Sequence, residues 1–185
     1  MISRFEWLYK TFFKDCNSIL DAGCGFGELC QLNPKKIIGI DNDKNNIKIC
    51  RKKGLNVKFV DLKKKLPFGD NTFDGINCSE VLEHLFYPLN TMKEFYRILK
   101  HKGRLVISVP CYKYYRAYHF SHHVFFRKCD VETIAKMSGF EIERIFEIRG
   151  FRFIQLFGEE IGFFIARLLP RLGIHGVVYL VAKKK

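Results

Sequence analysis

The sequence lacks the long apolar run that a membrane-spanning helix needs. Such a helix requires about 18 or more consecutive apolar residues, and the best candidate, residues 151–169, is interrupted by two arginines and two glutamates. The first 15 residues have neither an uninterrupted apolar core nor a small-residue cleavage site, so they do not resemble a signal peptide. We therefore expect a cytoplasmic protein without a transmembrane segment.

The sequence also lacks any Cys-x-x-Cys pair, although it contains seven cysteines. An odd number of scattered cysteines is typical of reduced, packed thiols. This pattern favours reduced thiols over a disulfide framework or a cysteine-based zinc site.

Acidic residues are scarce relative to basic ones, with 19 against 32 and a net charge of +13. A charge of this size favours contact with RNA, an acidic membrane surface or an acidic substrate. The lysines form short runs without the interleaved aromatic residues that a base-stacking platform needs. RNA and peripheral membrane contact therefore stay open as alternatives to simple solubility, and the oligomeric state is not predicted.

No linker, repeat or low-complexity segment divides the 185 residues, so we predict a single domain over residues 1–185. Short β-type runs alternate with helical stretches, which predicts a parallel sheet with helices on both faces. The runs cover residues 18–22, 36–40, 56–60, 72–78, 104–109, 141–148 and 177–182. Helices are expected at 43–53, from the residues after Cys78 to Leu99 with an interruption at Pro88, and at 131–138.

The first 15 residues are expected to form an amphipathic helix. Ser3 and Glu6 have the spacing of a capping box, and one helical stripe is apolar. We expect this helix to be a lid over the ligand site. Membrane contact through Trp7, Phe12 and Phe13 is the alternative, and a second apolar helix at 153–169, flanked by arginines, is open to the same two interpretations.

The segment Asp21-Ala-Gly-Cys-Gly-Phe-Gly follows the first predicted strand. A dinucleotide-binding loop would have its third glycine at position 28, where this chain has glutamate. The Gly-Lys-Ser/Thr of a phosphate-binding loop is also absent. Gly23, Gly25 and Gly27 instead suit a ligand that has an amino acid end and a nucleoside end but no phosphate. Asp21 is then expected to attract an ammonium group.

Two further acids follow the next two strands. Asp41 lies 20 residues after Asp21, where a carboxylate holds a ribose diol in related sheets. Asp61 follows the third strand and is placed to accept a hydrogen bond from an exocyclic amine.

Together these residues resemble the class I S-adenosylmethionine-dependent methyltransferases, type 11, the broad group that includes ubiquinone and menaquinone biosynthesis enzymes. The matching segments include "ILDAGCGFG", "IIGIDND", "SEVLEHL" and "EFYRILKHKGRLVISVP". The resemblance implies a three-layer Rossmann-like α/β sandwich, with a mostly parallel seven-stranded sheet and an antiparallel C-terminal strand. Residues 18–110 would be the cofactor-binding half and 111–185 the substrate-side half.

The resemblance also implies roles for individual residues. The methionine end of the donor S-adenosyl-L-methionine would be bound by Asp21, Gly23, Gly25 and Gly27. Its ribose would be bound by Asp41, and its adenine by Asn42, Asp61 and Leu62. The region below its sulfonium would be closed by Cys78 and Ser79 with Glu80.

Glu80, Glu83 and His84 are the candidate catalytic residues. Their spacing would place all three on one face of a helix, where two carboxylates and an imidazole could bind a divalent ion. Ubiquinone-pathway O-methyltransferases and small-RNA 2′-O-methyltransferases resemble this stretch and hold a metal there. A further ligand could come from His119, His122 or His123. Acid–base chemistry by His84 and simple helix packing stay open as alternatives, so no metal is assigned.

The tyrosines after the fifth strand (Tyr112, Tyr114, Tyr115 and Tyr118) are expected to face the acceptor, because ligands bind outside the carboxyl ends of parallel strands. We therefore expect a methyltransferase that acts on a small molecule with an aromatic or lipid-like hydroxyl. An RNA methyltransferase and a non-catalytic binding protein with the same fold are the alternatives.

Overall fold

The computed structural model describes residues 3–111, 120–149 and 176–185. Several predictions lie outside the described residues: the tyrosine wall (Tyr112, Tyr114, Tyr115 and Tyr118), His119, and the helix at 153–169 with its flanking arginines. No helix among the described residues is both long and apolar enough to cross a membrane.

Seven strands form one sheet in the order β3-β2-β1-β4-β5-β7-β6. They are β1 (Ile19–Ala22), β2 (Ile37–Asp41), β3 (Val57–Phe59), β4 (Phe73–Ser79), β5 (Leu99–Pro110), β6 (Phe140–Arg149) and β7 (Gly176–Lys184). Strands β1 to β5 pair in parallel, whereas β7 is antiparallel to both β5 and β6. The predicted mostly parallel seven-stranded sheet with an antiparallel C-terminal strand is confirmed.

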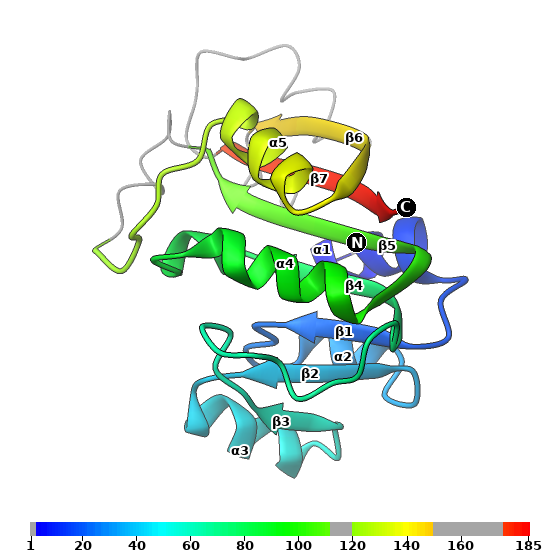
Figure 1. Cartoon of the computed structure of the whole chain (residues 1–185). Coiled ribbons are helices and arrows are strands. Elements are labelled where there is room, and N and C mark those ends of the chain that lie inside the picture. The colour runs from blue at the N-terminus through cyan, green and yellow to red at the C-terminus, as the bar shows by residue number, and fades with distance from the viewer. Residues whose placement is uncertain (1–2, 112–119, 150–175) are drawn as a thin grey trace.

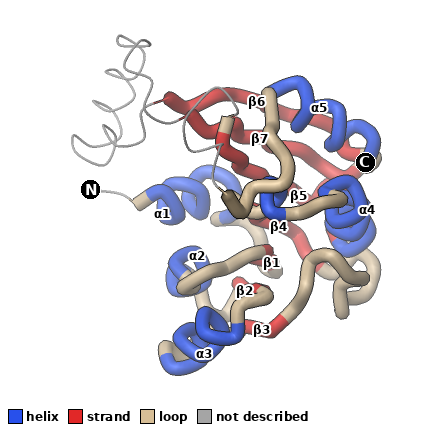
Figure 2. The backbone as a smooth tube through the Cα atoms, turned by 90° about the vertical axis from the view of Figure 1, so that its left-hand side faces the viewer, coloured by secondary structure: helices blue, strands red, loops and turns tan. Residues whose placement is uncertain are grey.

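The helices cover both faces of this sheet (Figures 1 and 2). α1 (Arg4–Leu8), α2 (Glu28–Leu32) and α3 (Lys44–Lys52) lie on one face, and α4 (Pro88–Ile98) and α5 (Lys128–Met137) on the other. Each face has its own buried apolar cluster, one around Leu29 and Ile47 and the other around Phe95 and Val131. The predicted three-layer α/β sandwich is therefore confirmed.

The N-terminal helix packs on the sheet. The Ser3 hydroxyl caps α1 by accepting from the backbone N–H of Glu6, and a π-helical turn continues it over Tyr9–Phe13. Phe12 and Phe13 are buried, and the Trp7 ring meets the Tyr179 ring edge-on at 5.8 Å. These aromatic side chains pack inward, so this face is not free to insert into a membrane.

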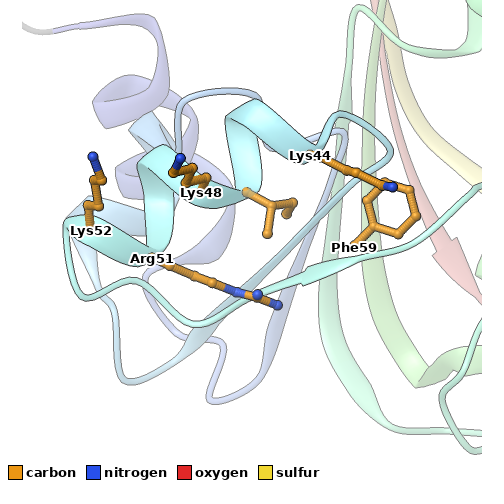
Figure 3. A pocket seen from close by; sticks show the side chains of 6 residues that line it. Lys44, Lys48, Arg51, Lys52 and Phe59 are labelled. Carbon is orange, nitrogen blue, oxygen red and sulfur yellow. The ribbon is translucent and has the colours of Figure 1, made fainter.

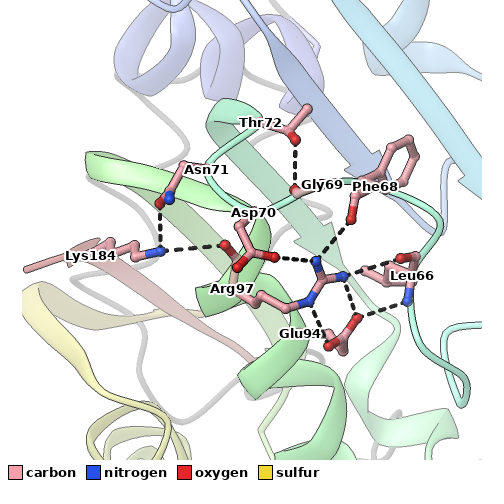
Figure 4. Close-up of polar contacts among 9 residues, drawn as sticks. All are labelled: Leu66, Phe68, Gly69, Asp70, Asn71, Thr72, Glu94, Arg97 and Lys184. Atoms are coloured by element: carbon pink, nitrogen blue, oxygen red, sulfur yellow. Dashed lines mark hydrogen bonds and ion pairs between the residues drawn. The ribbon is translucent and has the colours of Figure 1, made fainter.

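The connection from β3 to β4 is held by Arg97 of α4 (Figure 4). Its guanidinium donates to the carboxylates of Glu94 and Asp70 and to the carbonyls of Leu66 and Phe68. The Glu94 carboxylate in turn accepts from the backbone N–H of Leu66. This network fixes the loop that runs from Asp61 back to the centre of the sheet.

The helix predicted across Glu80, Glu83 and His84 is wrong. Only Leu82–His84 form a helical turn, of the tighter 3-10 type, and Glu80 has a left-handed backbone with φ of 55°. Pro88 begins α4, which suits a proline at the first helical position and disfavours helix in the residue before it. The chain between Ser79 and Pro88 therefore does not form one continuous helix.

Candidate functional site

The glycine loop between β1 and α2 has a left-handed backbone at each of its three glycines. The φ angles of Gly23, Gly25 and Gly27 are 76°, 51° and 77°. A Cβ on Gly23 would lie 2.3 Å from Cγ2 of Val81, and one on Gly27 would lie 2.5 Å from Cδ1 of Leu55. At Gly25 a Cβ would meet nothing within 4 Å. Packing therefore requires glycine at 23 and 27, while Gly25 borders open space.

Asp41, at the end of β2, holds this loop in place. One carboxylate oxygen accepts from the backbone N–H of Gly25 at 2.9 Å, and the other accepts from the N–H of Asp43 at 2.8 Å. The side chain is 9% exposed. Asp41 thus joins the glycine loop to the start of α3 and still reaches the surface of the adjoining cavity.

This cavity has a volume of about 230 Å³ and lies at the carboxyl ends of the parallel strands. In sheets of this type ligands bind at that edge. Its lining residues are Gly23, Asp41, Asn42, Val60, Asp61, Leu62, Lys63, Glu80, Val81, His84 and Leu85. Seven of them were singled out from the sequence, and they come from four separate stretches of the chain.

Four lining residues were missed: Val60, Lys63, Val81 and Leu85. Each is one or two residues from a predicted site residue, so proximity in sequence was the available signal. Three of them are apolar, and Lys63 is one of a run of three lysines, so their side chains gave no chemical signal of their own.

Other predicted residues do not line this cavity. Asp21 is 2% exposed, and its carboxylate accepts from Nδ2 of Asn77 at 2.8 Å and from the Cys30 thiol. Cys78 is fully buried, and the Ser79 hydroxyl donates to Oδ1 of Asn77. These three residues thus lie outside the lining of the cavity.

The burial of Asp21 changes its acidity. Removal from water raises the pKa of its carboxyl to about 6, and the hydrogen bonds from Asn77 and Cys30 only partly oppose this. An ammonium group placed beside it would stabilise the charged form.

The turn after β4 brings a carboxylate and two imidazoles together. Glu83, His84 and His122 each offer a ligand atom, and these atoms lie within 4.8 Å of one another. The His84 and His122 ring centroids are 4.7 Å apart. Glu83 is 1% exposed, and neither of its carboxylate oxygens has a hydrogen-bond partner. Burial, with a smaller contribution from Glu80, raises the pKa of Glu83 to about 9.

Glu80 is not one of these three ligand residues, although it lines the cavity. Its carboxylate pairs with the Arg4 guanidinium at 3.5 Å, and Arg4 also donates to the Ser108 hydroxyl. The N-terminal helix therefore reaches the rim of the cavity through one side chain.

A larger cavity of about 680 Å³ lies away from the glycine loop, between α3 and the end of β3 (Figure 3). Four basic side chains of α3 (Lys44, Lys48, Arg51 and Lys52) line it together with Ile47 and Phe59. The Lys44 ammonium lies 5.8 Å from the Phe59 ring centroid. Four basic side chains thus gather at the β3 edge of the sheet.

The fold, the glycine loop and the acids at the strand ends are together typical of class I methyltransferase domains. Residues 20–107 match the family model described as methyltransferase domain. Over this stretch the chain is similar to the class I S-adenosylmethionine-dependent methyltransferases, type 11, and the resemblance drawn from the motifs is confirmed. Enzymes of that class use S-adenosylmethionine.

Two curated relatives carry quinone-pathway names. A demethylmenaquinone methyltransferase from Symbiobacterium thermophilum is 28% identical over 135 residues, which is 66% of this chain and 54% of that protein. A ubiquinone/menaquinone biosynthesis C-methyltransferase from Escherichia fergusonii is 32% identical over 139 residues, which is 61% of this chain and 55% of that protein. The chain spans about half the length of these relatives.

Among solved structures, an S-adenosylmethionine-dependent methyltransferase from Archaeoglobus fulgidus superposes with a TM-score of 0.72. It is 24% identical, and the match covers 95% of this chain and 90% of that one. At this identity the likeness is evidence for the fold alone.

Proposed function

We propose that this protein transfers a methyl group from S-adenosyl-L-methionine to a small molecule with an aromatic or lipid-like hydroxyl. The observation that carries the proposal is the cavity at the strand ends, where Asp41, Asn42, Asp61 and Leu62 meet the glycine loop. Carboxylates at the ends of adjacent parallel strands suit the hydroxyls and the amine of a nucleoside.

The residues present fit the donor in two ways. The nucleoside half suits a cavity of about 230 Å³ with two acids and apolar side chains, because pockets for whole drug-sized ligands are about 300–1,000 Å³. The methionine half would extend over Gly25, where the backbone borders open space. Asp21 lies beneath this loop, and we propose that it interacts with the donor ammonium group.

The donor supplies an electrophilic methyl group, so the protein mainly aligns the acceptor with it and excludes water. A base is needed only when the acceptor is a neutral hydroxyl. His84 suits that role, because it lines the cavity and its Nδ1 lies 3.0 Å from the Ser121 carbonyl. A carbonyl only accepts hydrogen bonds, so Nδ1 carries the hydrogen and Nε2 keeps the lone pair that takes a proton.

The direct test is formation of S-adenosylhomocysteine when the purified protein is incubated with donor and a panel of acceptors. The panel contains aromatic hydroxyls, prenylated quinols and their deoxy analogues. We expect turnover with a hydroxyl compound, no turnover with its deoxy analogue, and a reduced rate for His84→Gln. Turnover that requires a carbon acceptor would contradict the hydroxyl assignment.

An RNA acceptor is the second candidate, and the basic side chains along α3 favour it. Binding of RNA through these side chains would be steeply dependent on salt. If the acceptor is a small molecule, as proposed, we expect competitor RNA to leave the rate of its methylation unchanged. Salt-dependent inhibition by RNA that is lost in Lys48→Ala/Arg51→Ala would favour the RNA assignment.

A further inference from the structure

We propose that Glu83, His84 and His122 bind a divalent transition-metal ion beside the donor cavity. The three side chains come from two segments far apart in sequence, the turn after β4 and the loop before α5. Their ligand atoms lie within 4.8 Å of one another, which is close enough for one ion to bind all three after small side-chain movements.

The burial of the Glu83 carboxylate is the observation that argues most strongly for a bound ion. Its carboxylate is 1% exposed and has no hydrogen-bond partner on either oxygen. A buried polar group without a partner destabilises the folded chain, and more so if it is charged. Leucine would avoid this cost, so a glutamate there indicates a ligand for its oxygens.

Backbone hydrogen bonds join the two segments, so the position of the cluster does not depend on side-chain packing alone. The N–H groups of His123 and Val124 both donate to the Glu83 carbonyl, at 2.7 and 3.2 Å. The His123 ring stacks on Phe86 at 3.8 Å between centroids, which holds the loop from the other side. Such a scaffold orients ligands before the ion arrives.

His84 is also in the right tautomer. Its Nδ1 donates to the Ser121 carbonyl, which leaves Nε2 unprotonated and able to bind a metal. Hydrogen bonding of the second ring nitrogen to a carbonyl is the usual outer-shell support of a metal-binding histidine.

The donor set indicates which ion to expect. Two imidazoles and one carboxylate suit Zn²⁺ and the neighbouring first-row ions better than Mg²⁺ or Ca²⁺, which prefer oxygen ligands. Three protein ligands leave a coordination position open. Because His84 also lines the donor cavity, that position would border the space for the acceptor.

The site deepens the proposed function and, in its catalytic use, rests on it. With the ion bound, Nε2 of His84 is a metal ligand and no longer a base, and the ion takes over its role: a hydroxyl bound at the open position would lose its proton to water more readily, since a bound cation lowers the pKa of a coordinated oxygen. Such a site suits the hydroxyl acceptor proposed above. Metal binding itself requires no methyl transfer and can be tested alone.

The experiment is calorimetric titration of Zn²⁺ into the full chain without a polyhistidine tag, after removal of bound metal with a chelator. Titration with Co²⁺, followed by visible absorption, gives a second readout that reports the ligands. Cys129→Ser serves as the background because Cys129 is the exposed thiol among the seven cysteines. We expect one ion per chain with the absorption of a nitrogen and oxygen site.

Glu83→Gln and His122→Gln should each weaken binding by at least the roughly 10–100-fold that loss of an outer-shell partner costs. His101→Gln, which changes an exposed histidine on β5, is the matched control and should leave binding unchanged. If Glu83→Gln does not fold, His122→Gln decides the result. Absence of stoichiometric binding, or equal affinity in the ligand variants and the control, would overturn the proposal.

Titration of the same samples with S-adenosylhomocysteine separates the two proposals. Metal binding without donor-product binding would contradict the proposed function and leave the metal site standing. The reverse result would remove the metal site and leave the methyltransferase assignment intact.

Discussion

At the scale of single residues, similar carboxylates have different tasks because their surroundings differ. Asp41 accepts two backbone N–H groups and lines the cavity, whereas Asp21 is buried beneath it. Sequence position predicted that both acids belong to the site. Their different burial could not be predicted, because it depends on Asn77 and Cys30, which approach Asp21 only in the folded chain.

Asp21→Asn should flatten the dependence of stability on pH. The folded pKa of about 6 lies above the usual value of 3.8, so the folded state binds the proton more tightly than the unfolded state. The wild-type protein therefore loses stability as pH rises from about 4 to about 6, and the loss persists above this range. Asparagine carries no charge and should recover about 1–3 kcal/mol at pH 8, from roughly 1.4 kcal/mol per pKa unit.

Urea unfolding at pH 4 and pH 8 measures this difference. Asp15→Asn, which changes an exposed acid shortly before β1, is the control. The same pH dependence in Asp21→Asn as in the wild type would show that Asp21 is not buried in its charged form. The variant should also bind S-adenosylhomocysteine more weakly if Asp21 interacts with the ammonium group.

At the scale of elements, local sequence pattern predicts the strands around the glycine loop correctly but does not predict the turn after β4. The strands β1, β2 and β4 were predicted because apolar runs end at acids or glycines. The spacing of Glu80, Glu83 and His84 predicted a helix here, and this prediction was wrong. In the structure Leu82 and Leu85 are buried, and their burial, together with Pro88, determines the path of the backbone between β4 and α4.

Gly25→Ala should weaken donor binding with little loss of stability. Its left-handed backbone costs alanine about 1 kcal/mol, and the added methyl group meets no protein atom within 4 Å. We expect that methyl group to occupy donor space and to reduce affinity by about tenfold or more, since misfit of one methyl is worth about 1–3 kcal/mol in a pocket.

Gly54→Ala is a matched control for this change. Gly54 also has a positive φ, of 73°, and open space at its Cβ, but it follows α3 outside the donor cavity. The two variants should lose similar stability in thermal unfolding, and only Gly25→Ala should lose affinity in titration. Equal affinity in both would place the donor elsewhere.

At the scale of the whole molecule, the sheet order brings the ends of β1, β2 and β4 together, because these three strands are neighbours at its centre. Alternating strands and helices made this architecture predictable from sequence. The pairing of His122 with Glu83 and His84 was only one of three histidine alternatives, since the loop before α5 must fold back over the turn to create it. Contacts of that kind depend on tertiary packing, which local spacing does not encode.

The central claim, donor binding at these strand ends, is tested most directly by calorimetric titration of S-adenosylhomocysteine into the wild type, Asp41→Asn and Asp43→Asn. Asp43→Asn makes the same charge change two residues away, and asparagine still caps α3. We predict one equivalent bound by the wild type and by Asp43→Asn. Asp41→Asn should bind at least about tenfold more weakly, because a hydrogen bond to a charged group is worth about 1.5–3 kcal/mol. No binding to the wild type, or equal affinity in all three proteins with circular dichroism unchanged, would contradict the assignment of the donor site.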